Sequence, residues 1–139
     1  MVTADTQLYR LIGAIARQST TSVNQQVKDL GLDNNLFLYL IRIVENAGIS
    51  QTDLVKLVRV DKTTLSRALK RLEDDDYIVK EIDPKNKKLK HLLPTTKGQA
   101  TYPLIAQIEA DYIHHALTEL NPTELTTLTN LLNKIYQQL

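Results

Sequence analysis

Apolar residues recur every three or four positions along most of the chain, the spacing that places them on one face of an α-helix. Polar cap residues and Gly31 divide this pattern into separate helices. The predicted helices cover residues 6–30, 35–46, 50–58, 61–74, about 96–119, and 122 onwards. The expected N-caps are Asp33 or Asn34, Ser50, Asp61, Thr95 or Thr96, and Asn121.

One part of the chain departs from the helical pattern. Residues 77–83 alternate and contain enough β-branched side chains to form a strand. The run Asp83-Pro84-Lys85-Asn86 is a turn signal, and residues 88–93 form the returning strand. The predicted fold class is therefore mainly α with a small β-hairpin.

The composition supports a helical chain and excludes several kinds of site. The 139 residues include only 4 Gly and 4 Pro, which argues against an all-β protein. Because cysteine is absent, disulfides, thiolate metal sites and cysteine nucleophiles are excluded. No phosphate-binding glycine loop, nucleophile elbow or metal-hydrolase motif occurs. We therefore expect neither an enzyme nor a bound cofactor.

The apolar runs are too short for a membrane helix. The longest, residues 36–41, falls far short of the ~20 residues that cross a bilayer. Residues 1–5 do not open a basic segment followed by an apolar one, as a signal peptide would. We expect a cytoplasmic protein that does not bind a membrane.

The formal net charge of +1 hides an uneven distribution of charge along the chain. Residues 48–99 hold 12 Lys and Arg against 8 Asp and Glu, which is a net charge of +4. The remaining residues hold 5 against 8, which is a net charge of −3. The charge therefore favours binding of a polyanion by the middle of the chain.

The helices at 50–58 and 61–74, joined by a tight turn at Arg59-Val60, are typical of a helix-turn-helix. The second helix of that motif enters the major groove of DNA. On a helical wheel, the face opposite Leu65 carries basic and hydroxyl side chains and no acid. Arg67 suits guanine, and Lys70 and Arg71 suit phosphates. The candidate DNA contacts on this helix are Lys62, Thr63, Thr64, Ser66, Arg67, Lys70 and Arg71.

The hairpin supplies a second set of candidate DNA contacts. Lys85, Lys87 and Lys88 stand at its tip, from which they would reach a minor groove or the phosphate backbone. A basic helix face taken alone is more commonly a solvated surface. The helix-turn-helix spacing and the adjoining lysines together favour double-stranded DNA as the partner.

The run from Ser50 to Arg67 resembles the MarR family of winged helix-turn-helix transcriptional regulators. The helix order is similar over nearly the whole chain. Three shorter segments resemble the family as well: Leu69-Lys70-Arg71-Leu72-Glu73, Thr95-Thr96-Lys97-Gly98, and Leu120-Asn121-Pro122-Thr123-Glu124-Leu125.

The resemblance implies a homodimer that binds a pseudo-palindromic operator. Residues 1–34 and 96–139 would form a helical dimerisation region, and residues 35–95 a winged helix-turn-helix lobe. One recognition helix per half-site, about 10 bp apart, would read the DNA. The resemblance also implies repression, relieved by a small ligand bound between the dimerisation helices and the lobe.

The sequence departs from the family pattern at the wing. Asp76 stands where the family usually has Gly, and Asn86 and Lys88 stand where it has Asp and Arg. Because lysine lacks the planar fork of arginine, minor-groove reading would be less selective. An alternative function follows, in which the chain is a protein-interaction module of the same fold that no longer reads DNA.

Candidate ligand and metal sites are weaker. The resemblance places Tyr39 and Arg42, on the second predicted helix, near the family's ligand site, which Arg17 could approach from the first helix. An Arg beside a Tyr suits an aromatic carboxylate. The alternative is that Tyr39 belongs to the core and Arg42 to an ion pair. His114 and His115 are adjacent and point about 100° apart on a helix, so we expect no metal site.

Overall fold

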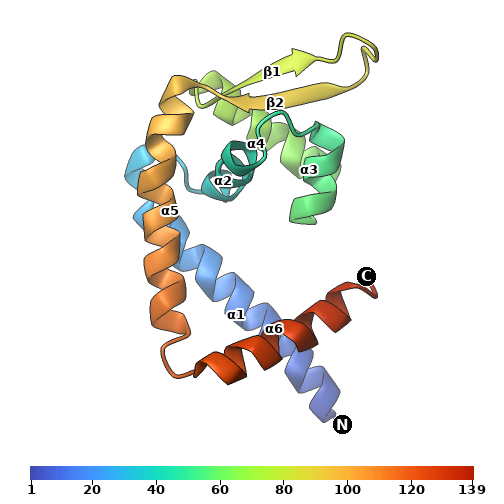
Figure 1. Cartoon of the computed structure of the whole chain (residues 1–139), viewed down its shortest axis with the longest axis vertical. Coiled ribbons are helices and arrows are strands. Elements are labelled where there is room, and N and C mark those ends of the chain that lie inside the picture. The colour runs from blue at the N-terminus through green and yellow to red at the C-terminus, as the bar shows by residue number, and fades with distance from the viewer. The chain divides into compact units, whose positions relative to one another are not determined.

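A computed structural model describes all 139 residues and confirms a mainly helical chain with one β-hairpin (Figure 1). The chain forms two compact units, residues 1–109 and 110–139. No helix is long and apolar enough to cross a membrane. The elements are α1 (Ala4–Gln26), η1 (Lys28–Leu30), α2 (Leu36–Glu45), α3 (Gln51–Val58), α4 (Lys62–Asp74), β1 (Ile78–Ile82), β2 (Lys90–Pro94), α5 (Thr96–Ala116) and α6 (Pro122–Tyr136).

The first helix is shorter than the predicted span of residues 6–30. It ends at Gln26, and the short 3₁₀ turn η1 follows. Val27 is fully buried, and its carbonyl oxygen accepts from the N–H groups of both Leu30 and Leu32. Gly31 then takes a left-handed conformation at φ 70°, so it does end the helical segment.

The N-cap of α2 is Asn35, so the prediction of Asp33 or Asn34 is wrong. Asn35 adopts φ 66°, a left-handed conformation that asparagine tolerates better than most residues. Asn24 of α1 holds it: the Asn24 carbonyl oxygen accepts from the Asn35 N–H, and the Asn24 amide donates to the Asn35 side chain, both at 2.9 Å. A contact between two elements therefore replaces the expected local cap.

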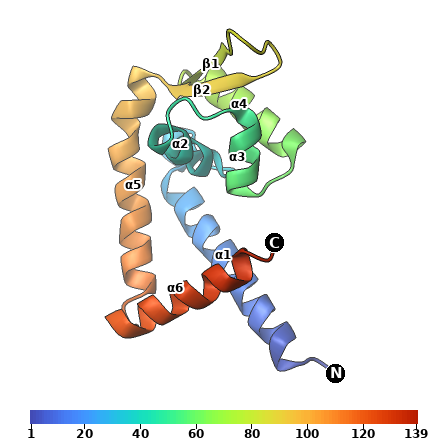
Figure 2. The ribbon, with the colours of Figure 1, turned by 45° about the vertical axis from the view of Figure 1, so that its right-hand side comes forward.

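The helix α2 lies at the centre of the predicted winged helix-turn-helix lobe (Figure 2) and is buried on several faces. It contacts α3, α4 and β2. The core residues around it are almost fully shielded from solvent: Leu40, Ile43, Leu54, Leu65, Leu69, Leu72 and Leu92.

The predicted caps of the other helices are confirmed where the cap and its partner are close in sequence. The Ser50 hydroxyl accepts from the Asp53 N–H at 3.0 Å, and an Asp61 carboxylate oxygen accepts from the Thr64 N–H at 3.0 Å. In the second unit, Asn121 and Glu124 form a reciprocal capping box at the start of α6.

The strands pair antiparallel and place Glu81 opposite His91. Strand β1 is one residue shorter at each end than the predicted span 77–83, and β2 begins two residues later and ends one residue later than the predicted span 88–93. The reason is Asp83, whose carboxylate accepts from the N–H groups of Lys85 and Asn86 and so turns the chain before the strand can continue. We call residues 83–89 the wing tip.

Tight packing joins the hairpin to α5, which ends at Ala116 rather than near residue 119. Asp76 adopts φ 62°, a left-handed conformation that aspartate tolerates better than most residues. The Thr95 hydroxyl donates to the Asp76 carbonyl oxygen at 2.6 Å and accepts from the Gly98 N–H at 3.0 Å. Gly98 lies against the Tyr77 carbonyl oxygen with no room for a Cβ.

Gly98→Ala is expected to lower the free energy of unfolding by about 1–3 kcal/mol, because the added methyl group would overlap the Tyr77 carbonyl oxygen. Urea unfolding at one fixed protein concentration measures the change. Gln99→Ala, at an exposed neighbouring position, is the control and should change stability by less than about 0.5 kcal/mol. Equal free energies of unfolding for the two variants would show that α5 can move away from Tyr77 without loss of stability.

Candidate nucleic-acid interface

The helix α4 presents a polar face to solvent because its apolar face is locked into the core. Leu65, Leu69 and Leu72 are fully buried. Thr63, Ser66 and Arg67 are exposed, as the helical wheel predicts. Since the cap at Asp61 fixes where the helix begins, its first two turns carry these side chains outward. Residues near the start of a recognition helix are the ones that contact base edges in a helix-turn-helix.

The second half of α4 is not acid-free, which corrects the wheel-based prediction. Lys70 Nζ lies 3.5 Å from Asp74 Oδ2, and Arg71 Nε donates to Asp75 Oδ2 at 3.1 Å. Each acid stands four residues after its base, which is the spacing of neighbours on a helix. The positive charge of Lys70 and Arg71 is therefore partly balanced.

The first half of α4 is free of such ion pairs, but Thr64 has a structural role. Its hydroxyl donates to Asp61 Oδ1 at 2.5 Å, which completes the cap and holds the pKa of Asp61 below its usual value. Its hydroxyl is therefore already engaged. Thr63, Ser66 and Arg67 remain as the side chains best placed for bases, with Lys62 beside them.

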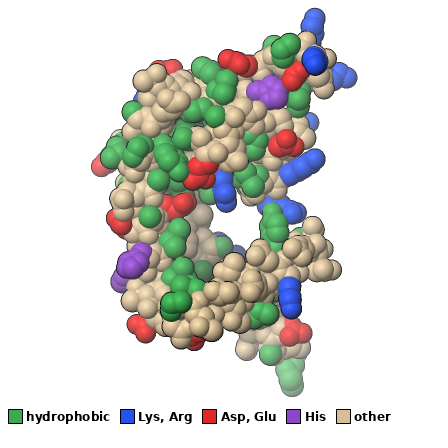
Figure 3. Space-filling view, in the orientation of Figure 1, with side chains coloured by type: hydrophobic (Ala, Val, Ile, Leu, Met, Phe, Trp, Pro, Cys, Tyr) green, Lys and Arg blue, Asp and Glu red, His purple; other side chains and the backbone are tan.

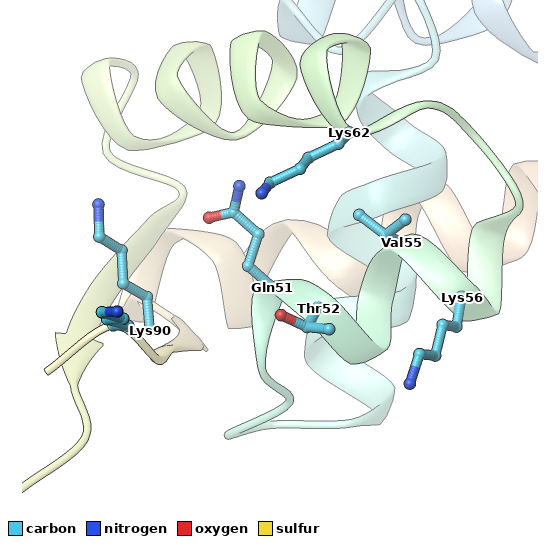
Figure 4. Close-up of a pocket in the computed structure, with 7 residues that line it drawn as sticks. Gln51, Thr52, Val55, Lys56, Lys62 and Lys90 are labelled. Atoms are coloured by element: carbon cyan, nitrogen blue, oxygen red, sulfur yellow. The ribbon is translucent and has the colours of Figure 1, made fainter. Parts of the chain in front are cut away.

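A hollow of about 350 Å³ opens beside α4 and gathers positive charge (Figure 4). We call it the lysine hollow. In Figure 4, Lys62 extends from the start of α4 across it toward Gln51 of α3. It is lined by Gln51, Thr52, Val55, Lys56, Lys62, Lys88 and Lys90.

Four polar lining residues of the lysine hollow, namely Gln51, Thr52, Lys56 and Lys90, are absent from the sequence-based candidates. They come from α3 and β2, whereas the wheel considered α4 alone. The spacing of Thr52 and Lys56 was an available signal, since residues four apart share a helix face. Gln51 and Thr52 also stand in the first turn of α3, where free backbone N–H groups favour an anion.

The wing tip carries Lys85, Lys87 and Lys88 on an ordered turn. All three side chains are exposed, and blue side chains gather at the hairpin tip in Figure 3. The Asn86 side-chain oxygen accepts from the Lys88 N–H at 3.1 Å. Asn86 therefore shapes the backbone of the wing tip.

His91 anchors the wing tip to the helix-turn-helix. Its Nε2 lies 2.7 Å from Asp83 Oδ2, and its Nδ1 lies 2.8 Å from the Gly48 carbonyl oxygen. The hydrogen bond with Asp83 is the main reason that the pKa of His91 lies above its usual value. The same bond lowers the pKa of Asp83, so the carboxylate remains ionised in the pair.

The three candidate ligand-binding residues stand in different settings. Tyr39 is 1% exposed, and burial, with the Asp61 charge second, raises its pKa. Arg42 is exposed, and its charge acts on Glu109, whose pKa is nevertheless raised by burial and by Glu45. Arg17 lies over Gly13 on α1. The structure places Tyr39 in the core, and ligand binding by this set stays a prediction.

The histidines are not gathered at a metal-binding cluster. His114 and His115 are exposed on α5, and no group of three His, Asp or Glu side chains has the arrangement to hold a metal ion.

Comparison with known proteins identifies the family of the chain. The model of the MarR family matches residues 32–90, and the transcriptional regulator YybA of Bacillus subtilis is 41% identical over 92% of this chain and 85% of its own length. The chain belongs to the MarR family. It is therefore a DNA-binding transcriptional regulator of the winged helix-turn-helix type.

Solved MarR family structures share the fold and include DNA complexes. A regulator from Listeria monocytogenes, complexed with a 26-mer DNA, is 42% identical with a TM-score of 0.90, covering 94% of this chain and 87% of its own. A single-site mutant of the Escherichia coli protein MarR, complexed with operator DNA, is 27% identical with a TM-score of 0.81, covering 93% of each chain. These complexes support DNA as the partner of the MarR family lobe described above.

Lys56→Gln is expected to reduce the slope of log affinity for DNA against log salt by about one unit, because one phosphate contact releases about one counterion. Fluorescence anisotropy over a series of salt concentrations measures the slope. Lys28→Gln, which removes an exposed lysine from η1 outside the lobe, is the matched control and should leave the slope unchanged. An unchanged slope for Lys56→Gln would remove the lysine hollow from the interface.

Proposed function

We propose that this MarR family chain is a homodimeric repressor that binds a pseudo-palindromic DNA operator. Each protomer places the first two turns of α4 in the major groove. The wing tip and the lysine hollow hold the phosphate backbone on either side. The observation that carries the proposal is the exposed polar face of α4, whose first two turns after the Asp61 cap carry no acid and lie next to four convergent lysines.

The contacts divide between reading the sequence and holding the backbone. Arg67 can pair with both acceptors of a guanine, and Thr63 and Ser66 can bond to either bases or phosphates. Lysines act as mobile point charges and suit phosphates. Specificity therefore depends mainly on Arg67, whereas affinity and its salt dependence come from the lysines.

The proposal of a homodimer is supported by apolar side chains that each unit leaves open to solvent. On α1, Leu8, Leu11 and Ile15 are each more than half exposed. The helix α6 has no buried residue, although it carries an apolar stripe of Leu128, Leu131, Leu132 and Tyr136. Such surfaces on a monomer mark protein interfaces, and family membership supports a second copy as the occupant.

Relief by a small ligand completes the proposed mechanism. A ligand that binds between the dimerisation helices and the lobe would change the separation of the two recognition helices. Arg17, Tyr39 and Arg42 are the proposed contacts, and Tyr39 would act from the core. If the ligand is anionic, aromatic acids added to the DNA-binding assay are expected to lower the affinity of the protein for DNA.

Arg67→Ala is expected to weaken binding to the preferred operator by about 1–3 kcal/mol and to relax specificity at one base position. Selection of bound sequences from random DNA, followed by anisotropy on the selected site, measures both. Lys70→Ala is the control, because the charge of Lys70 is already paired with Asp74. It should weaken binding less, and equally on all sequences.

Two outcomes of that experiment count against the proposal. An equal loss on every sequence would demote Arg67 to a phosphate contact. Failure of the wild-type protein to bind any DNA at low salt, including the DNA upstream of its own gene, would favour the alternative of a protein-interaction module.

Leu128→Glu is expected to convert the proposed dimer into monomers, because it places a charge in the middle of the apolar stripe of α6. Sedimentation equilibrium measures the mass. Asn130→Glu, on the opposite and exposed face of the same helix, is the control and should leave the mass unchanged. A monomeric wild-type protein at micromolar concentration would contradict the homodimer.

A further inference from the structure

His91 connects the wing tip to the turn between α2 and α3. Its two ring nitrogens face Asp83 Oδ2 and the Gly48 carbonyl oxygen at 2.7 Å and 2.8 Å. A backbone bridge between His91 and Ser50 joins the same two segments. Because the other oxygen of Asp83 accepts from Lys85 and Asn86, this series of contacts reaches the lysines of the wing tip.

Both partners of the His91 ring are hydrogen-bond acceptors. A backbone carbonyl oxygen and an ionised carboxylate have no proton to donate. A neutral imidazole carries only one N–H, so it can satisfy only one of them, whereas an imidazolium satisfies both. The geometry therefore selects the protonated ring.

We propose that His91 is a positioning residue whose protonated ring fixes the wing on the helix-turn-helix, so that loss of this proton weakens DNA binding. The inference rests on the proposed function for its effect on DNA. When the proton leaves to solvent, one of the two hydrogen bonds is lost. The wing tip is then held to the turn after α2 by fewer contacts.

The charges around His91 favour the protonated ring. Asp83 faces it from the wing tip and Glu81 from β1, and both favour the cation. The turn after α2 contributes the neutral Gly48 and Ser50. The charged residues of α3 are Asp53 and Lys56, and the neighbour on β2 is Lys90. Both lysines line the lysine hollow.

The direction of the pH dependence follows from the raised pKa of His91. A histidine in an unfolded chain loses its proton near its usual value of 6.5, whereas His91 in the folded protein retains it to higher pH. Both hydrogen bonds are therefore complete below pH 6.5, and one is lost as the pH rises through the pKa of the folded state. Asp83 remains ionised throughout this range, because its own pKa is lowered.

The first measurement uses nitrogen NMR of the full chain and needs no DNA. Imidazole nitrogen shifts report whether each ring nitrogen carries a proton. The double variant His114→Gln/His115→Gln retains only His91 of the three histidines, so its remaining imidazole signals are assigned to His91. We expect both His91 nitrogens to be protonated at pH 6.5 and the ring to titrate above it. A neutral His91 ring at pH 6.5 would overturn the proposal whether or not the protein binds DNA.

The second measurement follows DNA affinity as the pH rises through the His91 titration. The affinity of the wild type should fall by up to about tenfold, since a charge-assisted hydrogen bond shifts an equilibrium by at least that factor and the wing holds only part of the DNA. His91→Gln, which is neutral at all pH values, should lack this step and bind like the deprotonated wild type.

Two further variants separate positioning from simple loss of charge. Asp83→Asn keeps an oxygen for the Lys85 and Asn86 N–H groups but removes the anion, so the affinity step should move to lower pH. His91→Lys retains a cation but cannot reproduce both bonds, so its affinity at low pH should resemble that of His91→Gln. An affinity step that persists in His91→Gln, or full low-pH affinity in His91→Lys, would refute the positioning role.

Discussion

The burial of Leu65, Leu69 and Leu72 determines where the proposed DNA-reading face of α4 points. All three are fully buried, and each contributes about 1.5–3 kcal/mol by leaving water. A rotation of α4 by one residue, about 100°, would bring part of this stripe into solvent. The helix therefore has one favourable orientation, and in it Arg67 projects outward. Since α2 contacts both α4 and β2, the same core also supports the wing.

Features controlled by neighbours in sequence could be predicted, and those controlled by distant partners could not. The caps at Ser50, Asp61 and Asn121 bond to an N–H three residues away, so their residue types suffice to identify them. The cap of α2 depends on Asn24, eleven residues earlier and on another helix. No local pattern distinguishes Asn35 from Asp33 or Asn34, because the choice is made by packing against α1.

The same distinction between local and long-range control applies to the candidate site. The exposed face of α4 follows from helical periodicity, and the same periodicity places Asp74 on that face. The lysine hollow is different, since it exists only where α3, α4 and β2 meet. His91 and Asp83 share the hairpin, yet the contact with Gly48 that gives them their role spans 43 residues. Long-range contacts thus convert a basic segment into a shaped surface.

The use of lysine rather than arginine in the wing changes how affinity and specificity are distributed. An arginine held by an acid would insert into a minor groove and respond to its width, whereas flexible lysines respond mainly to charge. The position of the wing backbone then matters more than the conformation of any one side chain. Asn86 and Asp83 both bond to backbone N–H groups of the wing tip, and His91 ties Asp83 to the helix-turn-helix. In the proposed complex, a wing that reads charge therefore depends on the rigidity of its base, because the backbone of the turn sets where its lysine side chains begin.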